Sequence, residues 1–162
     1  MKKITILFTL LLLCLTFATS QAVPRSEATL GGITVGMNTS DVTNIYGEPA
    51  KISPLKAGNG LSDNAECWLY GDSFEIIFDK GIVVFVSTKA NNGIATPSGL
   101  TVGSKMFDVR RYYGQTYNDY PRDSYSYNGI EYALYNVDYS ALAIEFGYKD
   151  GKTCSIKIYA AV

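Results

Sequence analysis

Three carboxylates in strand-like segments, Glu75, Asp79 and Glu145, are the side chains of this sequence best suited to acid–base chemistry. Glu75 with either of the others could form the carboxylate pair of a glycosidase. The sequence has no histidine, no Cys-x-x-Cys pair and no phosphate-binding glycine loop, which excludes Ser–His and Cys–His nucleophile pairs and histidine-bound zinc. We interpret the carboxylates as solvated charges of an open sheet and predict no enzymatic activity, no cofactor and no metal site.

Tyrosine is the residue type whose distribution most favours binding. Nine of the 13 tyrosines lie between Tyr112 and Tyr139. Tyr117 and Tyr120 fall in a polar loop of that stretch and are candidate protein-binding residues. Recognition surfaces use tyrosine because it combines a large contact area with a polar tip and a low ordering cost. Tyrosine also suits β-strands for reasons unrelated to binding, so both interpretations of this stretch stay open.

Residues 1–22 have the pattern of a cleavable signal peptide. Lys2 and Lys3 precede an apolar run from Ile4 to Phe17, and the segment ends at Ala22 in a short stretch of mostly small residues. The run is shorter than the roughly 20 apolar residues that span a bilayer. We predict cleavage after Ala22 and a secreted, periplasmic or cell-envelope protein without stable membrane insertion.

The charge of the exported part limits its partners. Residues 23–162 carry a net charge of −3, and their lysines and arginines form no cluster along the sequence. Nucleic-acid binding needs a basic face that neutralises phosphates. We therefore predict that the partner is not a nucleic acid.

Two cysteines, Cys67 and Cys154, remain after cleavage. An oxidising compartment permits them to pair. Two consecutive β-meanders would place them at opposite ends of a sheet, roughly 20 Å apart at about 4.8 Å per strand, beyond the reach of a disulfide. A disulfide and two buried thiols both stay open as predictions.

The chain contains an internal repeat. Residues 32–47 align with residues 99–114 at a constant offset of 67, and eight of the 16 positions are identical without a gap. Each copy leads into strand-like segments, and a polar, glycine-containing turn separates the last two of them. The predicted strands are 67–70, 74–78, 82–86, 130–135, 142–146 and 154–159, with 124–127 as an additional one.

Each copy also predicts one short helix. In the first, Asn38 can cap the helix start while Asp41 reaches back to form a capping box, and Gly47 ends the helix. The second copy has Lys105 in place of the cap, which predicts a weaker start or one shifted to Ser104. One apolar stripe is expected to be buried on each helix, formed by Val42, Ile45 and Tyr46 and by Val109, Tyr112 and Tyr113.

Strand alternation separates two faces of the predicted sheet. The face under the helices would hold Phe74, Ile76, Phe78, Leu142, Ile144 and Phe146, with Leu69, Leu134, Ile156 and Ile158. The other face would be open and unusually aromatic. Its predicted protein-binding residues are Trp68, Tyr70, Phe85, Tyr135 and Tyr159.

The segment from Gly32 to Pro49, followed by Trp68 and Tyr70 and by a strand pair split at Asp79-Lys80-Gly81, resembles the SmpA/OmlA family of small envelope proteins. In tandem, the pattern resembles the β-lactamase inhibitor protein (BLIP-like) fold. This resemblance implies an α+β domain of two tandem repeats, residues 23–90 and 91–162, each a short helical segment followed by an antiparallel β-meander. The helices would lie on one side of the sheet, and the other side would be open.

Members of these families are binding proteins, so the resemblance implies a non-enzymatic protein-binding module. Tandem members include inhibitors that grip a hydrolase on the concave sheet, and single-repeat members help to assemble outer-membrane proteins. The matching positions are scaffold positions, so no binding residue is transferred. Two alternatives stay open: a carboxylate-dependent enzyme acting on cell-envelope glycans, and a structural envelope protein that associates with its own copies.

Overall fold

The computed structural model describes residues 23–114, 124–137 and 141–160. The predicted signal peptide, Tyr117 and Tyr120 lie outside these residues. The elements, in chain order, are η1 (Arg25–Glu27), α2 (Thr39–Tyr46), β1 (Lys51–Pro54), β2 (Ala65–Tyr70), β3 (Phe74–Asp79), β4 (Ile82–Thr88), α3 (Met106–Tyr113), β5 (Ser124–Tyr127), β6 (Ile130–Asn136), β7 (Leu142–Lys149) and β8 (Lys152–Ala160).

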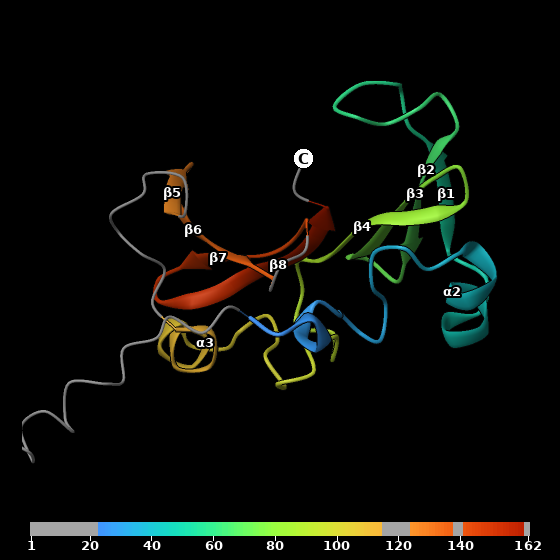
Figure 1. Cartoon of the computed structure of the whole chain (residues 1–162). Coiled ribbons are helices and arrows are strands. Elements are labelled where there is room, and N and C mark those ends of the chain that lie inside the picture. The colour runs from blue at the N-terminus through green and yellow to red at the C-terminus, as the bar shows by residue number, and fades with distance from the viewer. Residues whose placement is uncertain (1–22, 115–123, 138–140, 161–162) are drawn as a thin grey trace, which may run out of the picture.

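All eight strands belong to one antiparallel sheet with the order β1-β2-β3-β4-β8-β7-β6-β5. Its centre is the pairing of β4 with β8, which runs from Phe85 opposite Tyr159 to Thr88 opposite Ile156. Figure 1 shows η1, α2 and α3 on one side of the curved sheet, while the loop between β1 and β2 arches over the other side. Among the described residues, no helix is long and apolar enough to cross a membrane.

The predicted fold class, an α+β domain of two helix-plus-meander repeats, is wrong. The structure is a single eight-stranded antiparallel sheet. Its two α-helices have eight residues each, too few to form a helical layer of their own. Hydrogen bonds between β4 and β8 carry the sheet across the middle of the chain, so the sheet and not the helical segments defines the architecture.

The positions of the strands follow the sequence closely. Each predicted strand lies within one of the strands β2 to β8, because turn residues separate the apolar segments. Two of these turns place Lys80 and Asp150 at positive φ, each followed by a glycine at positive φ, as tight hairpins require. One strand was not predicted: β1, a four-residue strand that pairs with β2.

The helix starts differ as predicted. The Asn38 side chain accepts a hydrogen bond from the backbone N–H of Asp41 at 2.9 Å, and the Asp41 carboxylate accepts one from the backbone N–H of Asn38 at 3.2 Å. This reciprocal pair confirms the capping box. At the start of α3, Lys105 makes no capping hydrogen bond with its side chain.

The side chains buried between the sheet and the helices form one core. Phe74, Ile76, Phe78, Ile144 and Phe146 are each at most 1% exposed, as predicted. Val42 of α2 and Val109 of α3 join the same cluster. The same cluster contains four more strand residues with 0% exposure: Val83, Val86, Ile156 and Ile158.

The predicted faces of β2 and β6 are wrong by one residue. Trp68 lies opposite Ile76, and Tyr135 lies opposite Ile144, so both rings point into the core, while Leu69 and Leu134 lie on the other face. A one-residue slip moves every side chain of a strand to the other face.

The buried stripes of the two helices are narrower than predicted. Val42, Val109 and Tyr113 are buried, but Ile45 is 50% exposed and Tyr112 is 61% exposed. Each helix therefore contacts the core along a narrow stripe. Each helix therefore keeps an apolar side chain in solvent.

The two helix starts give a matched test of capping. We expect Asn38→Ala to lower the free energy of unfolding by about 1 kcal/mol, because the backbone N–H of Asp41 loses its side-chain acceptor. Lys105→Ala should change it by less than about 0.5 kcal/mol. Urea unfolding followed by circular dichroism measures both, and equal losses would contradict the assigned capping box.

Candidate functional site

A groove on the face of the sheet opposite the helices is the candidate functional site. It has a volume of ≈ 520 Å³ and is lined mainly by apolar side chains. Residues from β3, β4, β7 and β8 form its floor, and the loop between β1 and β2 forms one wall. The lining residues are Asn59, Gly60, Leu61, Ile77, Val84, Phe85, Glu145, Lys157, Tyr159 and Ala160.

Strand register brings the apolar floor together. Ile77 lies opposite Phe85, and Phe85 lies opposite Tyr159, so three adjacent strands contribute one continuous row. The rings of Phe85 and Tyr159 stack with centroids 6.2 Å apart at an angle of 23°. Both side chains are partly buried, which leaves part of each ring accessible from the groove.

A buried ion pair lies beside this aromatic row. Lys157 Nζ donates to Glu145 Oε1 at 2.5 Å, and the side chains of Lys157 and Glu145 are only 24% and 6% exposed. The Tyr159 hydroxyl donates to Glu145 Oε2 at 3.3 Å. The Lys157 ammonium also lies 5.0 Å from the centre of the Tyr132 ring, within cation–π range. These contacts fix the charged groups of the floor in one arrangement.

A glycine lets Tyr132 reach this network. Tyr132 lies directly opposite Gly147 in the sheet. A Cβ atom at position 147 would lie 3.2 Å from Cε1 of Tyr132 and 3.3 Å from Cγ2 of Ile130, closer than ordinary packing allows. The missing side chain makes room for the ring that faces Lys157.

The loop between β1 and β2 is held in place at both ends. The Leu55 N–H donates to the Ala65 carbonyl at 2.8 Å. The Ser62 hydroxyl donates to the Asp79 carboxylate on β3. The turn itself has Asn59 at φ 50° and flanking glycines at positive φ, so Leu61 projects from an ordered turn. The sequence analysis did not identify this wall, although the Gly-Asn-Gly run is a signal for a tight turn.

Three of the predicted binding residues are part of the core and not of the groove. Trp68, Tyr70 and Tyr135 are 8%, 9% and 5% exposed, and their rings contact Phe78, Phe74 and Phe146. The prediction that they lie on the open face is wrong. Cys67, Leu69 and Leu134, which are next to them in the sequence, are also apolar, so the alternation that would indicate the face is missing there.

The other two predicted residues of the sheet, Phe85 and Tyr159, do line the groove. The groove also includes Glu145, which was predicted to be a solvated charge, and Lys157, which was not predicted as a site residue. Their register could have indicated the pair, because the two residues lie directly opposite each other in β7 and β8.

The carboxylates do not have the spacing of a glycosidase. Glu75 is three strands from Glu145, through Ser87 and Lys157, or about 14 Å along the sheet. Glu75 and Asp79 are four residues apart on β3, or about 13 Å. Paired carboxyl groups in glycosidases lie about 5–9.5 Å apart. The geometry gives the enzyme alternative no support, and the predicted lack of activity stays a prediction.

The cysteines lie too far apart for a disulfide. Cys67 is on β2 and Cys154 is on β8, and β3 and β4 lie between them. Both are free thiols. Burial, and then the nearby Glu75 carboxylate, raise the pKa of the Cys67 thiol, which favours its protonated form. In the part of the chain that the structure describes, no group of three His, Cys, Asp or Glu side chains could hold a metal ion.

The two ion pairs of the open face give a matched test. We expect Lys157→Met to lower the free energy of unfolding by about 2–3 kcal/mol, because it removes the cation from a buried carboxylate while keeping the aliphatic stem. Lys89→Met removes the cation of the exposed pair with Glu75, whose side chains are 58% and 34% exposed, and should cost less than about 0.5 kcal/mol. Denaturant unfolding measures both, and similar losses would contradict the special status of the buried pair.

No family model and no curated protein matches this chain. It is similar in structure to a cysteine-rich secretory protein (SAV1118) from Staphylococcus aureus, with 14% identity, a TM-score of 0.58 and coverage of 86% of this chain and 48% of that chain. It is also similar to an extracellular protein containing a SCP domain from Bacillus anthracis, with 13% identity, a TM-score of 0.56 and coverage of 87% and 49%. A DUF4309 family protein (YjgB) from Bacillus subtilis has 14% identity, a TM-score of 0.47 and coverage of 80% and 82%.

The chain spans about half the length of the first two structures that it matches. Identity this low shows a shared fold alone. Both proteins are described as secretory or extracellular, which is consistent with the export predicted from residues 1–22. The resemblance to BLIP and to SmpA/OmlA stays a prediction.

Proposed function

We propose that this protein is an exported, non-enzymatic protein-binding module whose groove takes a projecting loop of a partner protein. The observation that carries the proposal is the row of Ile77, Phe85 and Tyr159 in a groove of ≈ 520 Å³ beside a fixed ion pair. An aromatic pair that is already stacked loses little freedom on binding. Aromatic side chains also dominate the energetics of protein interfaces.

The charged floor indicates what the tip of the partner loop carries. Lys157 has three N–H donors, one of which donates to Glu145, and its side chain keeps 24% of its surface accessible. A carboxylate of the partner can accept from a second donor, while an aliphatic or aromatic neighbour packs on Phe85. The favoured loop therefore pairs an apolar residue with an acidic one.

Two versions of the function agree with this groove: inhibition of an extracellular hydrolase, and service in envelope assembly. The resemblance to BLIP favours inhibition, and the resemblance to SmpA/OmlA favours envelope assembly. The protein would meet such a partner outside the cell, in the periplasm or at the cell envelope. The identity of the bound protein decides between the two versions.

The test is affinity capture from secreted and envelope fractions with residues 23–162 as bait. We expect Phe85→Ala/Tyr159→Ala to lose the partner that the wild type retains, because each lost ring should weaken binding by about 2 kcal/mol or more. The matched control is Ile45→Ala/Ile52→Ala, which removes apolar side chains that are 50% and 49% exposed outside the groove. Equal capture by the groove variant and the control would refute the groove as the binding site.

A further inference from the structure

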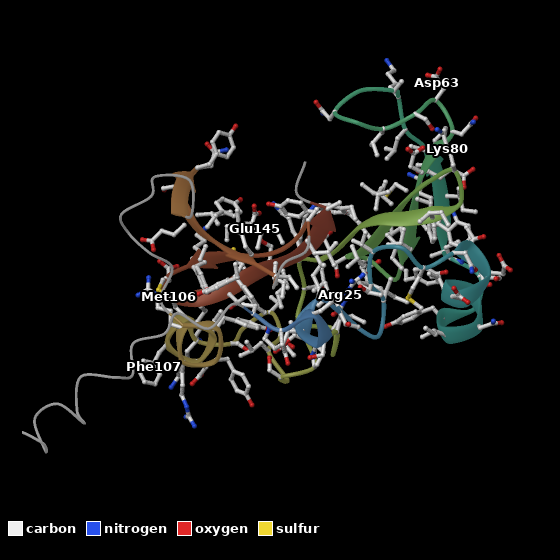
Figure 2. The ribbon with its side chains drawn as sticks, in the orientation of Figure 1. Arg25, Asp63, Lys80, Met106, Phe107 and Glu145 are labelled. Atoms are coloured by element: carbon white, nitrogen blue, oxygen red, sulfur yellow. The ribbon has the colours of Figure 1, made fainter. Side chains whose placement is uncertain are left out.

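Two aromatic rings that the core does not use flank the exposed surface of α3. Phe107 is 72% exposed and Tyr112 is 61% exposed. Arg110 and Arg111, on the same helix, are also exposed. Val109 and Tyr113 hold the opposite edge of the helix in the core. Figure 2 shows Phe107 projecting from α3 away from the sheet, so an aromatic and basic surface faces solvent.

The helix cannot easily turn to bury these rings, because it is tied down at both ends. At its start, the Met106 N–H donates to the Gly151 carbonyl at 2.9 Å. At its end, the Tyr113 hydroxyl donates to the Glu27 carboxylate at 2.7 Å and lies 3.2 Å from the Ser98 hydroxyl. Burial raises the pKa of Tyr113, so this hydroxyl stays a donor. The exposure of Phe107 and Tyr112 is therefore a fixed property of the fold.

The fold also gathers basic residues around this helix. Lys105 forms a β-bridge with Lys152, which brings the turn between β7 and β8 against the start of α3. The segments 105–113 and 149–152 together contain five basic and two acidic residues, which gives a net charge of +3 in a chain whose net charge is −1. We call this surface the α3 patch: Lys105, Phe107, Arg110, Arg111, Tyr112, Lys149 and Lys152, with Asp108 and Asp150 among them.

Exposed rings beside arginine and lysine match the chemistry of a lipid–water interface. Aromatic rings partition to the level of the headgroups. Each basic residue near an anionic membrane surface adds an attraction that salt weakens. A polyanion dissolved in water would need the charges but would leave Phe107 exposed, so the pair of rings favours a lipid surface.

We propose that the α3 patch binds the surface of an anionic lipid bilayer. The helix lies on the membrane without crossing it, with Phe107 and Tyr112 among the headgroups and the basic side chains on lipid phosphates. Export would place the protein next to such a surface. Because α3 and the groove lie on opposite faces of the sheet, a bound molecule would turn its groove away from the membrane. The proposal does not depend on the function of the groove.

The test is co-sedimentation of residues 23–162 with vesicles of phosphatidylcholine alone or mixed in equal parts with phosphatidylglycerol. We expect binding to the anionic vesicles only, and a loss of roughly tenfold or more in affinity when NaCl rises from about 50 to about 500 mM. Arg110→Gln/Arg111→Gln and Phe107→Ser/Tyr112→Ser should each weaken binding by roughly tenfold or more. Ile45→Ser on α2 and Phe85→Ala/Tyr159→Ala in the groove should bind as the wild type does.

Fluorescence locates the ring directly. Trp68 is the single tryptophan and is buried, so it gives a constant background for a Phe107→Trp variant. We expect the emission of the introduced indole to shift to the blue on anionic vesicles. Circular dichroism confirms that each variant is folded. Weak binding to every vesicle would overturn the proposal, and so would binding that needs the arginines but not the rings, which indicates simple attraction to a polyanion.

Discussion

The hydrogen-bonded seam between β4 and β8 is the interaction on which the rest of the structure depends. Over the register from Phe85–Tyr159 to Thr88–Ile156, it joins strands from the two halves of the chain. Without it, two four-stranded sheets would each expose an unpaired central edge. The same seam sets Phe85 beside Tyr159 and Ser87 beside Lys157. The floor of the groove therefore consists of side chains from both sides of the pairing that holds the fold together.

The main role of the buried ion pair on the open face is to hold neighbouring side chains in fixed positions. Burying two charges costs desolvation energy that can equal or exceed their attraction, so such a pair is weak support for stability. Glu145 accepts from both Lys157 and Tyr159, which fixes the tyrosine ring against Phe85. Lys157 in turn lies over Tyr132, whose ring has room because residue 147 is glycine. A floor that is fixed in this way loses little freedom when a partner binds.

Local patterns in the sequence predicted the strands, the turns and the capped helix, because each of these depends on a few neighbouring residues. The sequence did not indicate which side chains of β2 and β6 point into the core. Cys67-Trp68-Leu69-Tyr70 and Ala133-Leu134-Tyr135 are apolar at every position, so no alternation of polar and apolar residues distinguishes the two faces. The predicted fold class was wrong because it was based on two short repeated segments that each form a helix. The pairing of β4 with β8, which joins all strands into one sheet, is a long-range contact that no local pattern indicates. Two residues of the groove, Phe85 and Tyr159, were predicted. The pair of Glu145 with Lys157 was missed, although it follows from the register of the β7–β8 hairpin, whereas the position of the loop at 59–61 over the sheet depends on the tertiary fold.

The sheet is open, and its two outermost strands, β1 and β5, have only four residues each. A free strand edge can template the addition of another chain. On β1, Pro54 has no backbone N–H to offer and Lys51 adds a charge. Within the residues that the structure describes, edges this short offer only a few hydrogen bonds to an incoming strand. Pairing of copies edge to edge into a fibre would therefore have a short and weak contact at each joint.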